Sequence, residues 1–179
     1  MSDHEVTLVE ISITPTEARE RAAAVREWLL VVGVIVANPT PGTLADPSEY
    51  LAGQHVEGTA TSDEVDRVLM NSGVDILTDR QVFDSGENFE PPVCPGCATP
   101  LDADEYLDLL GQWLRAGEPM VPCARCGYSV RLGDWPGEWA CQVGELGVCF
   151  NNWPPLRDGF VRELGQRLGP RWRVVYGHY

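Results

Sequence analysis

Hydrophobic and polar positions alternate near the start of the chain, over residues 6–13. Val9, Ile11 and Ile13 fall on one side of an extended segment, and Glu10 and Ser12 fall on the other. A period of two residues is typical of a β-strand. We therefore expect a strand here with one buried face, which the three apolar side chains form.

The next segment carries the signals of a helix. Residues 14–17 (Thr-Pro-Thr-Glu) combine a capping hydroxyl, a proline at the first helical position and a glutamate three residues after the cap. Apolar side chains then recur at helical spacing on one face, at Ala18, Ala22, Val25 and Leu29. We expect an amphipathic helix that begins after Thr14 and ends at Gly33.

Signals are weaker between this helix and residue 93. A continuous β-branched run over residues 34–37 predicts a short buried strand, and the Pro- and Gly-rich residues 39–61 predict a long loop with at most short elements. A short helix over residues 63–70 and a strand over residues 74–78 are expected next. Residues 84–93 are expected to form a linker or an edge segment.

The last fifty residues again have clear periods. Leu146, Val148 and Phe150 alternate as in a strand, and Trp172, Val174 and Tyr176 alternate in the same way. Between them, apolar residues step by four along a helix, at Leu156, Phe160, Leu164 and Leu168. The chain therefore begins and finishes with a strand-helix-strand unit.

Two such units suit an α+β fold, a ferredoxin-like sandwich in which two helices cover one face of an antiparallel sheet. A three-layer α/β arrangement is the alternative. We expect residues 1–90 to form the N-terminal half with a loop-rich acidic segment, residues 91–133 to form an inserted cysteine module, and residues 134–179 to complete the sandwich.

Composition excludes several functions. The 179 residues include 27 carboxylates, 13 arginines and no lysine, for a net charge of −14. P-loop, pyridoxal Schiff-base and protein-kinase sites all need a lysine. The acidity is concentrated in residues 1–93, with 17 acids against 5 arginines, so nucleic acid and anionic lipid are disfavoured partners. We find no signal peptide and no apolar run long enough to span a membrane, and we expect a cytoplasmic, reducing location.

Four cysteines form the strongest motif. Cys94-Pro-Gly-Cys97 and Cys123-Ala-Arg-Cys126 are paired CxxC turns separated by 25 residues. Two residues between cysteines let a tight turn present both sulfurs to one ion, and two such turns complete a tetrahedron. Four sulfurs leave no open coordination position, so the metal would be structural.

Residues 94–126 resemble a zinc ribbon, with the CPxC and CxxCG knuckles of that family and, more distantly, of rubredoxins. The resemblance implies bound Zn²⁺ with Cys94, Cys97, Cys123 and Cys126 as ligands. The usual ribbon is all-β, whereas residues 102–116 predict an amphipathic helix capped by Asp102 and Glu105. The whole chain also resembles small bacterial proteins, some labelled sugar-transporter ATPases, but a Walker A motif requires a lysine.

Two other interpretations of the cysteines stay open. Iron is the alternative metal, because rubredoxins use similar knuckles. A reversible dithiol is the other, because CPGC resembles the active-site turn of thioredoxin-type proteins, although prolines flank it here on both sides. Cys141 and Cys149 are interpreted as small buried side chains.

No catalytic motif is recognised. The histidines His4, His55 and His178 stand apart in the sequence, and no HExxH, GxSxG or GxGxxG occurs. Tryptophans concentrate in the C-terminal half. Trp153 is interpreted first as a core residue and alternatively as part of an interaction patch with Asn151, Asn152 and Arg157.

We therefore expect a zinc-stabilised acidic protein that binds a macromolecular partner, of the inhibitor, immunity or adaptor type, with a basic protein as the preferred partner. A small enzyme or ligand-binding protein with a cleft near the Trp-rich half is the second hypothesis. Nucleic-acid binding through the ribbon, with Arg125 and Arg131, is the third.

Overall fold

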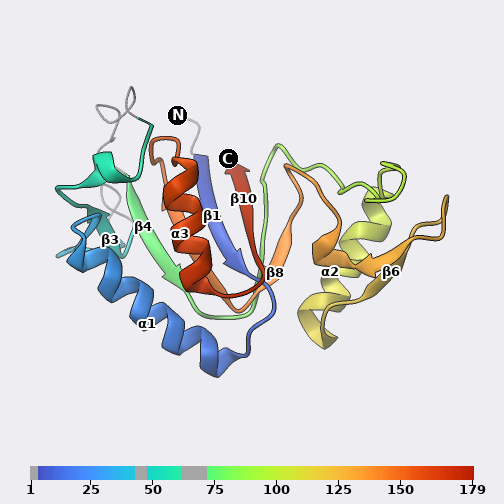
Figure 1. Ribbon diagram of the computed structural model, residues 1–179, viewed down its shortest axis with the longest axis horizontal. Coiled ribbons are helices and arrows are strands. Elements are labelled where there is room, and N and C mark those ends of the chain that lie inside the picture. Colours follow the sequence, from blue (N-terminus) through green and yellow to red (C-terminus); the bar gives the residue numbers. More distant parts are fainter. Residues whose placement is uncertain (1–3, 43–47, 62–71) are drawn as a thin grey trace.

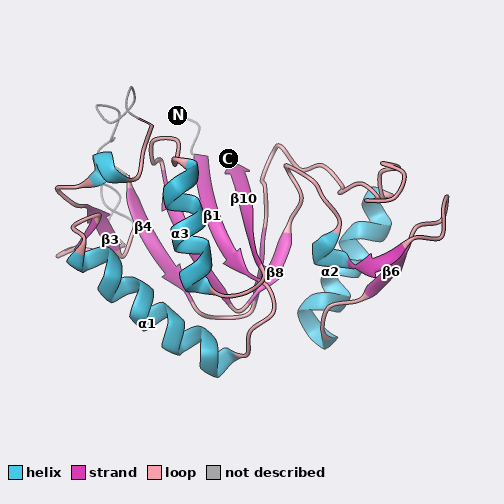
Figure 2. Ribbon diagram, viewed as in Figure 1, coloured by secondary structure: helices cyan, strands magenta, loops and turns pink. Residues whose placement is uncertain are grey.

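The computed structural model describes residues 4–42, 48–61 and 72–179 of the chain. Its helices are α1 (Pro15–Val31), α2 (Ala103–Ala116), α3 (Asp158–Leu168) and the short 3-10 turns η1 (Val56–Gly58) and η3 (Leu132–Asp134). Its strands are β1 (His4–Glu10), β2 (Ile35–Ala37), β3 (Tyr50–Ala52), β4 (Gly73–Leu77), β5 (Gln81–Phe83), β6 (Met120–Pro122), β7 (Ser129–Arg131), β8 (Gln142–Gly144), β9 (Leu146–Asn151) and β10 (Trp172–His178). Figures 1 and 2 show their arrangement.

The main sheet has six strands in the order β10-β1-β9-β4-β3-β2, and every neighbouring pair among the described residues is antiparallel. Helices α1 and α3 lie together on one face of this sheet (Figure 1). Two further antiparallel pairs, β5–β8 and β6–β7, lie beyond it. The fold is therefore α+β as expected, and the three-layer α/β alternative is wrong.

Local sequence signals account for the helices. Thr14 caps α1, its side chain accepting from the Glu17 amide while the Glu17 carboxylate accepts from the Thr14 amide. The predicted face of α1 is buried, and the chain leaves the helix through Gly33, at a φ of 71°. Helix α3 begins at Asp158 and buries Phe160, Leu164 and Leu168, whereas Leu156 lies before it. The predicted helix over residues 63–70 lies outside the described residues.

The first strand-helix-strand unit differs from the prediction. The run over residues 34–37 forms β2 at the edge of the sheet, where it pairs with β3 and leaves Val36 46% exposed. The position beside β9 belongs to β4 instead. Val34 and Ile35 are buried as expected, but the prediction of a buried strand fails at Val36 because a short β-branched run suits an edge strand as well as a central one.

Strand β1 is buried on both faces. Leu8 packs into the core beneath α1 and α3, and Val9 packs into a second core on the opposite face. Glu10 has no exposed surface, and its carboxylate accepts hydrogen bonds from Ser12 and from the Arg171 amide at 2.9 Å. The prediction of a single buried face was therefore wrong, and the buried carboxylate ties the β1–α1 turn to the start of β10.

The second core joins the sheet to the cysteine module, which we define as residues 91–133. Three large side chains of α2, Tyr106, Leu110 and Trp113, lie in one cluster with the sheet residues Val9 and Val175. Cys94 and Cys123 belong to the same cluster. The module therefore packs against the sheet through an apolar contact on the face opposite α1 and α3.

Two arginine networks reinforce this contact. Arg171 donates to both carboxylate oxygens of Glu118, at 2.6 and 2.9 Å, and to Asp134. On the other side, Arg80 donates to the carbonyl oxygens of residues 113 and 114 at the end of α2 and pairs with Glu145 at 2.8 Å. The residue 114 carbonyl is one of the groups that a helix end leaves without a partner inside the helix, and Arg80 supplies that partner; the residue 113 carbonyl also accepts from the Gly117 amide at 3.1 Å.

No helix in the described part of the chain is long and apolar enough to cross a membrane.

Candidate metal centre

The Sγ atoms of Cys94, Cys97, Cys123 and Cys126 all lie within 4.8 Å of one another. Two sulfur–sulfur contacts join one knuckle to the other, with Cys94 to Cys126 at 3.6 Å and Cys97 to Cys123 at 3.7 Å. A tetrahedral site with Zn–S bonds of about 2.3 Å has S···S edges of about 3.8 Å. The cluster therefore has the size of a four-cysteine metal site, and its ligands come from both predicted turns.

The two knuckles have the same backbone geometry. In the first, the Ala98 amide donates to the Cys94 carbonyl at 2.8 Å, and in the second the Gly127 amide donates to the Cys123 carbonyl at 2.8 Å. The residue after the second cysteine has a positive φ in both, 55° at Ala98 and 74° at Gly127. Each turn ends in a left-handed residue, which glycine adopts without strain and alanine does not.

This difference gives opposite predictions for the two turns. We expect Gly127→Ala to lower the free energy of unfolding of the metal-loaded protein by about 1 kcal/mol, because a Cβ at this φ is strained. A Cβ at Gly127 meets no atom within 4 Å, so the backbone alone causes the effect. We expect Ala98→Gly to raise the free energy of unfolding by up to about 1 kcal/mol. Urea unfolding of both variants measures the effects, and changes of the same sign would contradict the prediction.

The surroundings of the cluster favour ionised sulfur at Cys97. Its Sγ lies 3.2 Å from the Thr99 hydroxyl oxygen, and hydrogen bonding to the Thr99 side chain lowers the pKa of Cys97 to about 6. The Arg125 guanidinium donates to the same hydroxyl oxygen at 3.3 Å. The Thr99 hydroxyl therefore contacts both the Cys97 sulfur and the Arg125 guanidinium, which places a cationic side chain beside the cysteine cluster.

The pKa values of Cys123 and Cys126 shift in opposite directions. The backbone amide of Cys126 lowers the pKa of Cys123. Although the Tyr128 amide acts in the same direction on Cys126, the adjacent Cys97 sulfur raises the pKa of Cys126 to about 12. Neighbouring thiolates repel one another, so the four ionise together only when a cation offsets that repulsion. The donor set suits a soft divalent ion with four sulfur ligands.

The pairing of sulfurs also bears on the dithiol interpretation. Sulfur–sulfur contacts of 3.6 and 3.7 Å run between the knuckles, so all four sulfurs share one cluster. A thioredoxin-type centre would pair the two cysteines of a single CxxC turn at the start of a helix. Here α2 begins at Ala103, six residues after Cys97, with Asp102 as its N-cap. The geometry favours a shared ion over a redox pair.

The other residues singled out from the sequence lie apart from this centre. Cys141 and Cys149 are both buried and free, as expected of small core side chains. Trp153 is 1% exposed, and its indole N–H donates to the Thr59 hydroxyl at 3.0 Å, which agrees with the core interpretation. Asn152 is also buried, Asn151 is half-buried and Arg157 is exposed. Partner binding by this patch stays a prediction.

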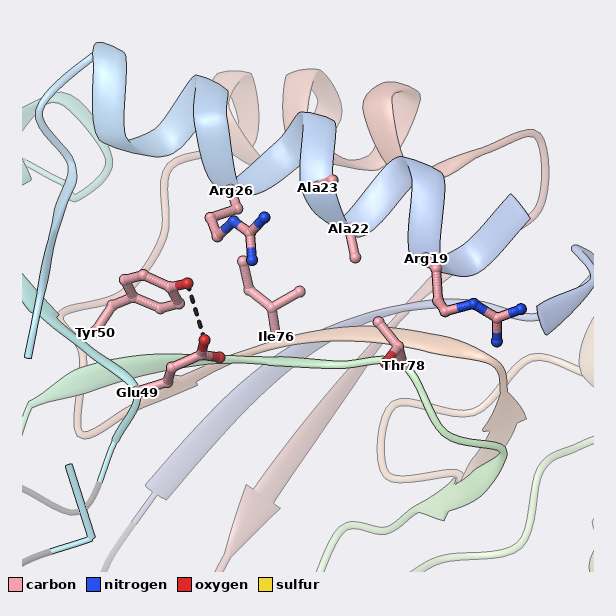
Figure 3. Close-up of a pocket in the computed structure, with 8 residues that line it drawn as sticks. All are labelled: Arg19, Ala22, Ala23, Arg26, Glu49, Tyr50, Ile76 and Thr78. Atoms are coloured by element: carbon pink, nitrogen blue, oxygen red, sulfur yellow. Dashed lines mark hydrogen bonds between the residues drawn. The ribbon is translucent and has the colours of Figure 1, made fainter. Parts of the chain in front are cut away.

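A cavity between α1 and β4 was not foreseen from the sequence (Figure 3). It has a volume of about 310 Å³ and is lined by Arg19 and Arg26 on α1 and by Tyr50, whose hydroxyl donates to Glu49 at 2.9 Å. The two arginines lie seven residues apart, about 10 Å along a helix. Figure 3 shows Arg19 at the end of the cavity away from the Tyr50–Glu49 pair, so the charged groups do not converge on one point.

The roles of Thr99 and Arg125 beside the cysteines were also missed. Their positions within two residues of a ligand are the only sequence signal for them, since hydrogen bonding around a metal often comes from such neighbours. No protein-family model matches the chain, and no curated protein or solved structure is found to be similar to it.

Proposed function

We propose that the protein binds one structural Zn²⁺ through Cys94, Cys97, Cys123 and Cys126, and that it acts by binding a basic macromolecular partner. The convergence of four sulfurs within 4.8 Å carries the metal assignment. Four thiolates in a closed tetrahedron suit zinc or iron, and we prefer zinc because the four-cysteine sites of zinc ribbons hold it as a structural ion. The proposal includes a zinc-ribbon relationship for residues 94–126. It also includes a cytoplasmic location, which keeps the thiols reduced.

The ferredoxin-like arrangement stays part of the proposal. It is supported by the strand order β10-β1-β9-β4. If β1 and β4 are the two strands of the first unit, and β9 and β10 those of the second, this is the order fourth, first, third, second. Strands β2 and β3 then extend one edge. Within this scheme, residues 91–133 are an insertion between halves formed by residues 1–90 and 134–179.

Partner binding is proposed from charge. A net charge of −14 steers a basic protein toward the chain and repels nucleic acid and anionic lipid. A metal with four cysteine ligands has no open coordination position for a substrate or water. Its role is therefore to stabilise the fold and not to catalyse a reaction. An inhibitor, immunity or adaptor role fits these properties.

The test is affinity capture of the zinc-loaded protein from its native cell extract at about 0.1 M and about 0.5 M salt, with metal content measured in parallel. We expect about one zinc per chain and basic proteins released at the higher salt. A red, iron-containing protein overturns the metal assignment, and co-purifying RNA or DNA overturns the partner assignment in favour of binding through Arg125 and Arg131. If neither a basic protein nor a nucleic acid is captured, the proposal of partner binding is overturned and the second candidate is favoured.

A cleft in the Trp-rich half supports that second candidate, a ligand-binding protein or small enzyme. The cavity has a volume of about 280 Å³ and lies between α3 and the ends of β1 and β10. Its walls are mostly apolar, with His4 and Asp158 as polar groups; they include Val6, Trp153, Pro155, Leu156, Val161 and Tyr176. Apolar walls with few polar groups are typical of small-molecule sites.

A further inference from the structure

The side of α2 that faces segment 82–89 carries an apolar hollow of about 390 Å³. Leu107, Leu110 and Gly111 of α2 form one wall. The rest of the lining includes Val82, Phe89 and Cys141. Leu107 is 52% exposed although it is a large apolar side chain, whereas the buried face of α2 is formed by Tyr106, Leu110 and Trp113. The hollow therefore offers unburied apolar surface to a partner.

A second hollow adjoins the first and shares Phe89 with it. This one has a volume of about 260 Å³ and is lined by Glu87, Asn88, Phe89, Glu90 and Trp139. Two carboxylates beside an indole ring suit an arginine or lysine head group, which pairs with carboxylates and is attracted to aromatic faces. The two hollows together therefore offer an apolar site next to a cation site.

Acidic residues surround the apolar hollow as well. Asp84 lines it directly. Asp104 and Asp108 are exposed on α2, and helix geometry puts positions 104, 107, 108 and 111 on one face. The Arg115 guanidinium lies beside Gly111, so three carboxylates and one cation border the hollow. Their net charge is negative, which disfavours nucleic acid and anionic lipid at this place and favours a cationic occupant.

Segment 84–90 is held in place by hydrogen bonds to other parts of the chain. The Ser85 hydroxyl donates to the Trp139 carbonyl at 2.6 Å, and the Glu87 amide donates to the His178 carbonyl at 2.8 Å. The Phe89 ring stacks on Tyr106, with ring centres 5.9 Å apart. The two hollows are therefore formed before binding, so that less conformational entropy is lost when a partner binds.

We propose that these adjoining hollows bind a basic segment of a partner protein, with one large apolar side chain in the α2 hollow and a neighbouring arginine or lysine beside Trp139, Glu87 and Glu90. The inference rests on the proposed function, because it names the surface that the basic partner contacts. Apolar burial supplies affinity in the larger hollow, and the carboxylates select a cation in the smaller one.

The probe is the peptide acetyl-Arg-Gly-Leu-Gly-Arg-amide, because side chains two positions apart point to the same side of an extended chain. It is titrated into the ¹⁵N-labelled, zinc-loaded protein, and binding is followed by NMR through the Trp139 indole and the amides of Phe89 and Leu107. We expect shifts concentrated at these positions. A peptide with glycine in place of leucine should bind about tenfold more weakly or worse.

Two double variants with the same change of charge separate local from overall attraction. E87Q/E90Q removes both carboxylates of the second hollow, and we expect it to weaken peptide binding about tenfold. E20Q/E27Q removes two exposed carboxylates of α1 as the matched control, and it should change the affinity less than about twofold.

Equal losses in the two double variants, or shifts centred away from Phe89 and Trp139, overturn the proposal. If E87Q/E90Q still captures the basic partner from cell extract as the unaltered chain does, the hollows are not the contact surface although the proposed function stands. If neither the peptide nor a basic partner binds the unaltered chain, both the surface and the proposed function are wrong.

Discussion

Removing zinc is expected to unfold the two knuckles while the six-stranded sheet stays folded. Structural zinc contributes on the order of 10–16 kcal/mol in finger peptides, so the two turns that the ion joins should depend on it more than the sheet does. Cys94 and Cys123 belong to the core between module and sheet, whereas the core beneath α1 and α3 contains no ligand cysteine. Hydrogen exchange after chelation should therefore show loss of protection at residues 93–101 and 120–131 and retained protection in β1 and β9.

Two cysteine variants control this experiment. Cys123→Ser removes a ligand and should reproduce the effect of the chelator without any chelator present. Cys141→Ser changes a buried cysteine outside the cluster and should keep about one zinc per chain. Because bound thiolates compete with protons, zinc should also be released as the pH falls. A chain that binds no zinc, or one whose sheet and knuckles lose protection together on chelation, would contradict the prediction.

Trp153→Ala is expected to lower the free energy of unfolding by about 3–5 kcal/mol, the cost of a large aromatic cavity in a core. Trp153 packs edge-on against Phe150, with ring centres 5.4 Å apart, and its indole N–H is bonded to Thr59. Both the packing and this bond are lost in the variant. Thermal and urea unfolding, monitored by far-UV circular dichroism, measure the change.

Two further substitutions help to interpret the loss of stability in Trp153→Ala. Trp153→Phe keeps an aromatic ring but removes the N–H donor, so we expect a smaller loss of about 1–2 kcal/mol. Trp139→Ala, at a half-buried position, should cost less than Trp153→Ala. A Trp153→Ala variant that unfolds like the unaltered chain would exclude the core role and would favour the patch of residues 151–157.

Features encoded by neighbouring residues were predictable from the sequence. The capping residues before α1, the Asp102 cap of α2 and the period of α3 are local signals, and each marks a helix that is present. The cysteine cluster was predictable for a similar reason, because each CxxC turn sets the geometry of its own two sulfurs.

Features that depend on distant pairing were not predictable. The burial of Glu10 depends on the Arg171 amide, 161 residues away, and the edge position of β2 depends on β4 taking the place beside β9. A strand's own residues do not say which strands flank it. The hollows around Phe89 were missed because they form only where segment 82–89 meets α2 and Trp139.

The packing of α2 against the sheet limits how far the cysteine module is transferable. A peptide of residues 91–133 would retain all four cysteines, but Tyr106, Leu110 and Trp113 would lose the part of their core that lies outside the module, which includes Val9, Val143 and Val175. Grafted onto another scaffold, the module would carry its ion-binding turns together with an apolar helix face open to aggregation. Unlike an autonomous zinc finger, this module is therefore expected to have diverged together with the strands that it packs against.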